Sequence, residues 1–123
     1  MKIQESAENY LETILMLSQQ NPPVRSIDIV NELAITKPSV SVAMKNLREN
    51  GYIEMDDSGY ISLTPKGKEI AESVYERHTL LAKWLQSLGV DSSIAADDAC
   101  RIEHVISPET FEAIKKLFDH STQ

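Results

Sequence analysis

Three side chains in the C-terminal part of the chain have types and spacing that suit metal binding. Glu103 and His104 lie three and four residues after Cys100, so on a helix all three side chains lie on one face. A thiolate, a carboxylate and an imidazole are all ligands of divalent transition metals. A cysteine alone is more often a small buried apolar residue, but the three residues together predict a metal site.

Side chains elsewhere in the chain offer ligands that would complete such a site. Asn9 and Glu12 lie three residues apart near the N-terminus, and His78 lies nearer the middle. Each of these residues alone is explained as a polar residue on the surface of a helix. A metal held from both ends of the chain suggests a switch that controls the residues between them.

The residues between these ligands have the pattern of a DNA-binding module. Residues 26–33 and 37–50 are expected to form two short helices joined by a tight connection, with Thr36 as the N-cap of the second. Residues 52–55 and 60–63 are strand-like runs separated by a polar turn that contains glycine, which predicts a hairpin. This order of elements predicts a winged helix-turn-helix.

The second of these helices has an apolar side and a polar side. The polar side and its flanks provide the candidate DNA contacts, which are Arg25, Lys37, Pro38, Ser39, Ser41 and Lys45. The alternative is a small helical core with a stray hairpin and no nucleic acid partner. DNA binding is favoured because the polar side chains cluster where base contacts are made.

The rest of the chain is expected to be helical. A long helix over about 65–88 precedes the helix that carries the three metal ligands, and Ser107 and Pro108 begin a last helix. The last helix is expected to turn its apolar residues inward, namely Phe111, Ile114, Leu117 and Phe118. Residues 80–120 carry more apolar side chains than so short a segment hides alone, which predicts a dimer interface.

Composition and charge are consistent with a small protein of two domains. We expect a mainly α fold, with a winged helix-turn-helix DNA-binding domain over residues 1–70 and a helical metal-binding and dimerisation domain over 71–123. The net charge of -7 argues against DNA, but residues 25–68 carry six Lys and Arg against six Asp and Glu. The acidic excess therefore lies outside the DNA-binding module.

The location of the protein is indicated by features that the sequence lacks. No run reaches the roughly eighteen apolar residues of a membrane span, and the first residues do not have the apolar stretch of a signal peptide. The chain has one cysteine, so an internal disulfide is excluded. We expect a cytoplasmic protein that does not bind membranes.

Four segments together resemble the diphtheria-toxin-repressor family. They are the run S-A-E-N-Y-L-E-T-I-L, the L-T-P-K-G after the hairpin, the pair Arg77-His78, and the run D-A-C-R-I-E-H-V-I-S. Members of this family are dimeric, iron- or manganese-dependent bacterial repressors. The resemblance implies a repressor that senses Fe2+ or Mn2+, with Co2+ or Zn2+ acting in vitro. It also implies that a homodimer binds double-stranded operator DNA and controls metal-homeostasis genes.

The resemblance also assigns candidate ligands. The chain is similar in length to the compact two-domain form of the manganese regulators, in which the positions of Asn9 and Cys100 usually hold acids. The iron regulators have a methionine and a cysteine there, so this chain combines features of both branches. Glu12 and His78 match a second site of the manganese branch, which would share Cys100 or Glu103 as a bridge.

Two other interpretations of the cysteine are open. Cys100 beside Arg101 could be a redox sensor in a DNA-binding regulator, with no metal. A hydrolase that uses the cysteine, the glutamate and the histidine would need an open coordination position or an oxyanion-stabilising loop. The chain has four glycines and none of them adjoins Cys100, so we expect no enzyme.

Overall fold

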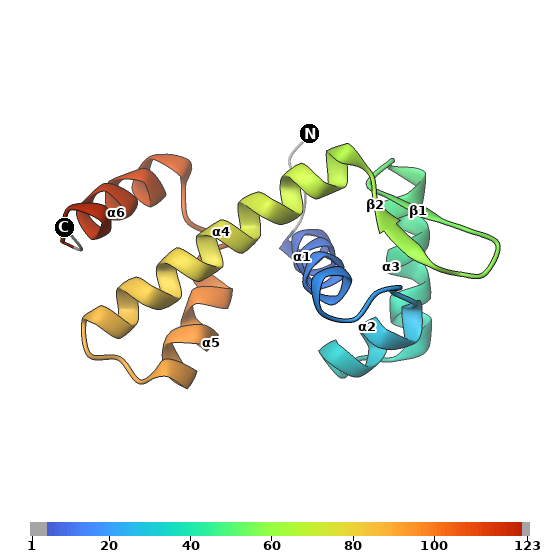
Figure 1. The fold of residues 1–123 in the computed structure, drawn as a ribbon, viewed down its shortest axis with the longest axis horizontal. Coiled ribbons are helices and arrows are strands. Elements are labelled where there is room, and N and C mark those ends of the chain that lie inside the picture. Colours follow the sequence, from blue (N-terminus) through green and yellow to red (C-terminus); the bar gives the residue numbers. More distant parts are fainter. Residues whose placement is uncertain (1–4, 122–123) are drawn as a thin grey trace. The chain divides into compact units, whose positions relative to one another are not determined.

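The computed structural model describes residues 5–121, and these form a mainly helical fold with one small sheet (Figure 1). Within that range the elements are α1 (Glu5–Gln20), α2 (Ser26–Leu33), α3 (Lys37–Glu49), β1 (Ile53–Met55), β2 (Ile61–Leu63), α4 (Pro65–Ser87), α5 (Ser92–Ile102) and α6 (Pro108–Ser121). The chain divides into two compact units. We call the part up to Ser73 the winged unit and the part from Val74 the C-terminal unit.

Helices α2 and α3 are joined by a connection whose conformation their sequence determines. The backbone N–H of Arg25 donates to Asp28 Oδ2 at 2.9 Å, which fixes the start of α2. Ala34 ends α2 in the left-handed region, with φ of 54°. Thr36 is the N-cap of α3, as expected, because its Oγ1 accepts a hydrogen bond from the N–H of Ser39 at 3.3 Å.

The wing is an antiparallel hairpin of β1 and β2 in which Ile53 pairs with Leu63. Each strand has three residues, slightly fewer than the sequence runs suggest. Asp56 closes the turn, since its Oδ1 accepts hydrogen bonds from the N–H groups of Ser58 and Tyr60, both at 2.9 Å. A feature that the sequence did not predict is a bridge in which the N–H of Ile61 donates to the carbonyl of Val24 at 2.7 Å, which ties the segment before α2 to the wing.

One apolar core holds the winged unit together. Every element of the unit contributes to it, through Leu11, Ile14, Leu15, Val24, Ile29, Val40, Met44, Leu47, Ile53, Ile61 and Ala71. Because α3 buries Val40, Met44 and Leu47 on one side, its opposite side faces the solvent. The expected apolar and polar sides of this helix are therefore both present.

The start of α4 is fixed against the connection between α3 and β1. Thr64 Oγ1 donates to the carbonyl of Gly51 at 2.7 Å and accepts from the N–H of Gly67 at 3.2 Å. A Cβ atom on Gly67 would lie 2.0 Å from the carbonyl oxygen of Tyr52. The first turn of α4 therefore packs directly on backbone, at a distance that only glycine permits.

The C-terminal unit has a smaller core. Leu81, Ala82 and Ala99 are buried, and half-buried apolar residues of α4, α5, α6 and the α5–α6 segment pack against them, namely Trp84, Ile102, Ile106 and Ile114. Several large apolar side chains of this unit are exposed, which are Tyr75, Leu88, Ile94, Val105 and Leu117. The expectation that Leu117 faces inward is wrong, since 61% of its surface is accessible. Among residues 5–121, no helix is both long and apolar enough to cross a membrane.

Candidate metal centre and DNA-binding surface

The three candidate ligands that the sequence singled out lie at the C-terminal end of α5. Asp91 is the N-cap of this helix, and a hydrogen bond from the Ser93 side chain lowers the pKa of Asp91 below its ordinary value. The helix ends at Ile102, so Glu103 and His104 lie just beyond it rather than within it as expected. Glu103 nevertheless keeps helical angles, and its N–H donates to the carbonyl of Ala99 at 2.9 Å. The expected spacing is therefore preserved.

The side chains of Cys100, Glu103 and His104 converge. One ligand atom from each, a sulfur, a carboxylate oxygen and an imidazole nitrogen, lies within 4.8 Å of the other two. The side chain of Glu103 is fully buried and that of His104 is 2% exposed. A cluster of such groups away from water is costly unless charges of opposite sign balance it.

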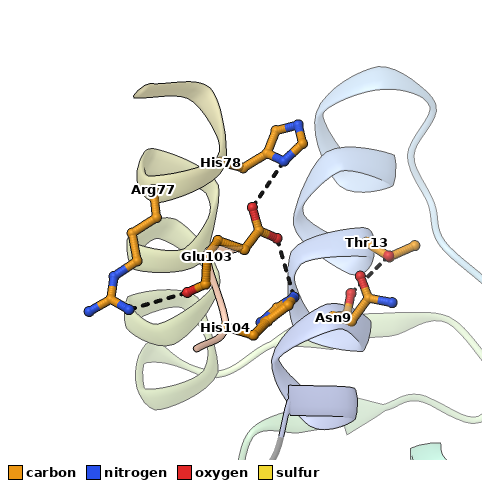
Figure 2. A network of polar contacts seen from close by, with 6 residues as sticks. All are labelled: Asn9, Thr13, Arg77, His78, Glu103 and His104. Atoms are coloured by element: carbon orange, nitrogen blue, oxygen red, sulfur yellow. Dashed lines mark hydrogen bonds and ion pairs between the residues drawn. The ribbon is translucent and has the colours of Figure 1, made fainter. Parts of the chain in front are cut away.

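Glu103 lies between two histidines (Figure 2). Its Oε2 is 2.9 Å from Nδ1 of His78, and its Oε1 is 3.3 Å from Nε2 of His104. Oε1 makes no hydrogen bond to any residue that the structure describes. A divalent cation would supply the charge that a buried carboxylate oxygen needs, and the sulfur and imidazole beside it are suitable further ligands. The donor set therefore fits a metal.

Arg77 contacts the segment that carries these ligands. Its Nη1 donates to the backbone carbonyls of Glu103 and Ile106, at 3.2 Å each, and its guanidinium carbon lies 5.5 Å from the ring centre of Phe111. The sequence marked Arg77 only as part of a family motif. Arg77 is 26 positions from Glu103 and 29 from Ile106 in the sequence, so no local sequence pattern predicts these contacts.

The two remaining candidates lie on α1 in the winged unit. Asn9 and Glu12 are separated by three residues and so share a face of this helix. Thr13 Oγ1 donates to the backbone carbonyl of Asn9 at 2.8 Å (Figure 2), so the side-chain amide is the group of Asn9 to consider as a ligand. The other four candidates all belong to the C-terminal unit.

The candidate DNA contacts are exposed side chains of the winged unit. Arg25 and the α3 residues Lys37, Pro38, Ser39, Ser41 and Lys45 are all exposed. Arg25 Nη2 donates to the hydroxyl of Tyr60 at 2.9 Å, and its guanidinium lies over the Tyr60 ring. Val42, which the sequence pattern did not single out, is 61% exposed on the same helix and offers an apolar contact for a thymine methyl group.

The wing itself is unfavourable for contact with phosphates. Glu54, Asp56 and Asp57 are all exposed on or beside its turn. Their negative carboxylates repel the negative phosphates of DNA. The candidate DNA contacts are therefore those of α3 and of Arg25, and not those of the acidic wing turn.

A winged helix-turn-helix with a basic and polar second helix, followed by a helical unit in which Cys, Glu and His side chains converge, defines a DNA-binding regulator with a metal site. The family model described as the iron dependent repressor N-terminal DNA binding domain matches residues 2–61. The model described as the iron dependent repressor metal binding and dimerisation domain matches residues 64–123. The chain belongs to the iron-dependent repressor family and is a metal-sensing transcriptional repressor, which confirms the resemblance to the diphtheria-toxin-repressor family.

Individual relatives span most of the chain. It is 33% identical over 113 residues to an HTH-type transcriptional regulator of Methanocaldococcus jannaschii, covering 90% of both chains. It is 35% identical over 112 residues to the HTH-type transcriptional regulator MntR of Bacillus pumilus, covering 91% of this chain and 78% of the relative. The solved structure of the manganese regulator SloR matches with a TM-score of 0.82 and 26% identity over 97% of this chain. The chain spans about half of SloR, namely 55% of its length.

Proposed function

We propose that this repressor senses Fe2+ or Mn2+ through Cys100, Glu103 and His104 and, as a homodimer, controls metal-homeostasis genes. The observation that carries the proposal is the buried carboxylate of Glu103. Its Oε1 lies beside the His104 imidazole and makes no hydrogen bond among the described residues. A carboxylate in such a place is explained when a cation is its partner.

The donor types bear on which metal is sensed. Thiolate sulfur is a soft ligand that suits Fe2+, Co2+ and Zn2+, whereas Mn2+ prefers carboxylate oxygen. SloR is described as a manganese regulator. We propose that Cys100 moves the preference of this chain toward Fe2+, and that Mn2+ is bound more weakly.

We further propose Asn9, Glu12 and His78 as additional ligands. His78 is supported by its contact with Glu103. Asn9 and Glu12 are supported by the match of their segment to the family pattern and by their shared face on α1. Ligands from both units would let the metal state control the DNA-binding unit, because two recognition helices of a dimer must match major grooves about one helical turn apart.

The DNA contacts are proposed from exposure and charge. Lys37, Ser39, Ser41 and Lys45 would face the major groove, and Pro38 would contact it from the first turn of α3. Arg25 would bind a phosphate. The functional division is a DNA-binding domain over residues 1–70 and a metal-binding and dimerisation domain over 71–123. We propose a cytoplasmic protein without enzymatic activity.

The test is DNA binding by metal-free protein, titrated separately with Mn2+, Fe2+, Co2+ and Zn2+ under anaerobic conditions. We expect operator affinity to rise by about tenfold to a hundredfold with at least Fe2+, since a preference of a few kcal/mol for one state suffices. A scrambled duplex is the control. An affinity that follows peroxide and ignores both metals and chelator would reject the metal proposal in favour of a redox role for Cys100.

A further inference from the structure

The guanidinium of Arg77 lies where the ligand-bearing segment leaves α5. This segment runs from Glu103 to the start of α6 at Pro108. Carbonyl groups beyond a helix end have no donor within the helix and need another partner. Arg77 Nη1 supplies it for two of them, the carbonyls of Glu103 and Ile106, at 3.2 Å each.

Arg77 is itself held in place. It is half-buried, and its guanidinium carbon lies 5.5 Å from the centre of the Phe111 ring on α6, within the range of a cation–π contact. A planar group fixed on one side by a ring loses little further freedom when it donates hydrogen bonds. The arginine is therefore a rigid support for the segment and not a flexible surface charge.

Consecutive residues of α4 hold the same glutamate in two places. Arg77 binds the backbone carbonyl of Glu103, while His78 Nδ1 lies 2.9 Å from Oε2 of its side chain (Figure 2). Both contacts reach Glu103 from one turn of α4. Together they fix the backbone position of the ligand and the direction of its carboxylate.

We propose that Arg77 is a positioning residue of the metal site, which holds the backbone of residues 103–106 so that Glu103 and His104 meet Cys100 before a metal binds. This inference rests on the proposed metal site. Groups outside the ligand shell that orient the ligands commonly change metal affinity by about tenfold to a hundredfold. No ligand role is assigned to the arginine, because a guanidinium has no acceptor for a cation.

The direction in which metal affinity changes when Arg77 is replaced distinguishes a positioning role from an effect of its charge. Arg77 carries a positive charge near a site for a cation, so its electrostatic effect alone opposes metal binding. Removing the charge would then raise the metal affinity. Removing the support of the segment would lower it, so the two roles predict opposite results for one variant.

A neighbouring contact supplies a matched control. Glu76, the residue before Arg77, receives a 2.8 Å ion pair from Lys115 of α6. This pair also joins α4 to α6, but among the described residues Glu76 makes no hydrogen bond or ion pair with residues 103–106. Glu76→Gln therefore tests whether weakening any contact between α4 and α6 is enough to change the metal site.

The experiment is anaerobic titration of the full chain with Co2+, followed by two absorption signals. The near-ultraviolet band reports the bond between cobalt and the Cys100 thiolate, and the visible bands report the geometry of the whole ligand set. In Arg77→Met, which keeps an apolar stem against Phe111, we expect Co2+ affinity on the order of tenfold lower. In the same variant we expect the thiolate band to persist at saturation and the visible bands to change. We expect a smaller loss of Co2+ affinity in Arg77→Lys and no loss in Glu76→Gln.

Each result has one meaning. Unchanged or higher Co2+ affinity in Arg77→Met, or an equal loss in Glu76→Gln, overturns the positioning role. A lower melting temperature with an unchanged visible spectrum at saturation also overturns it, because general destabilisation leaves the bound geometry intact. If Arg77→Met does not fold, Arg77→Lys decides in the same way. A wild-type protein that shows no thiolate band would instead reject the metal site itself.

Discussion

The imidazole of His78 and the carboxylate of Glu103 lie 2.9 Å apart, measured from Nδ1 to Oε2, although 25 positions separate them in the sequence. This contact occupies one carboxylate oxygen, while the other lies on the side of His104. Glu103 can therefore serve two neighbours at once, because a carboxylate accepts through both oxygens. Its carboxylate thus lies beside both His78 and His104.

The two partners of this contact should differ in their importance for metal uptake. Glu103→Gln removes the only buried negative charge of the Cys-Glu-His cluster, so we expect Co2+ affinity to fall by at least about a hundredfold. His78→Gln removes a partner at the second oxygen, and we expect a loss nearer tenfold. Anaerobic Co2+ titration measures both, with far-ultraviolet circular dichroism to confirm folding. Equal losses would show that the histidine is as central as the glutamate.

Metal preference should follow the atom at position 100. Cys100→Glu replaces a soft sulfur by carboxylate oxygen, and we expect the ranking of metals that activate DNA binding to shift toward Mn2+. Cys100→Ser is the control, since it removes the sulfur without adding a carboxylate and should weaken the binding of every metal. DNA binding measured against each metal gives the ranking. The same ranking in Cys100→Glu as in the natural chain would exclude the thiolate from the ligand set.

Lys45 should act on DNA and not on metal. Lys45→Met removes an exposed charge from α3, so we expect weaker operator binding and a salt dependence reduced by about one counterion. Co2+ uptake without DNA should be unchanged. Lys83→Met is the matched control, because Lys83 is an exposed lysine of the C-terminal unit. A parallel loss of metal affinity in Lys45→Met would indicate a folding defect.

Glu12 should transmit the metal state to DNA binding. In Glu12→Gln we expect the cobalt–thiolate band to remain, because Cys100, Glu103 and His104 are intact. We expect most of the metal-dependent gain in operator affinity to be lost, with Glu8→Gln on the same helix as the control. The measurement is operator affinity with and without Co2+. If Glu12→Gln binds DNA tightly without metal, relief of charge repulsion and not bridging explains activation.

The N-cap Asp91 of α5 is expected to make a contribution to the free energy of unfolding that depends on pH. The hydrogen bond from the Ser93 side chain lowers its pKa in the folded state, so the ionised carboxylate favours folding at neutral pH and this contribution is lost as the pH falls. Asp91→Asn retains an N-cap acceptor but cannot titrate. Urea unfolding should show the natural chain to be the more stable at pH 7. The difference should shrink below about pH 4, and a difference independent of pH would contradict the assignment.

Local patterns in the sequence predicted the parts of the structure that short-range interactions determine. The N-cap at Thr36 and the apolar side of α3 were confirmed, and so was the closeness of Cys100, Glu103 and His104, which follows from helical spacing. The exact end of α5 was not predicted, because Ile102 is followed by no glycine or proline before Pro108. There, tertiary contacts decide where the helix stops.

Local patterns did not predict the contacts between distant residues, and the closeness of His78 to Glu103 was implied by the family resemblance alone. The bridge from Val24 to Ile61 adds one pair to the wing, and a single pair has no alternating pattern to mark it. The hydrogen bonds of Arg77 to carbonyl groups depend on backbone geometry, which side-chain types do not encode. The exposure of Leu117 was missed because the apolar pattern of α6 does not say which of its sides is covered.

The close approach at Gly67 has a consequence for how this chain tolerates mutation. Even alanine there would bring a carbon to 2.0 Å from the Tyr52 carbonyl oxygen, and both atoms belong to the main chain or directly adjoin it, so no rotamer relieves the overlap. Gly59 is different, since its φ of 83° is merely strained for other residues and the space around it is open. In a library of variants selected for folding, position 59 should therefore accept asparagine, while position 67 should accept no alternative.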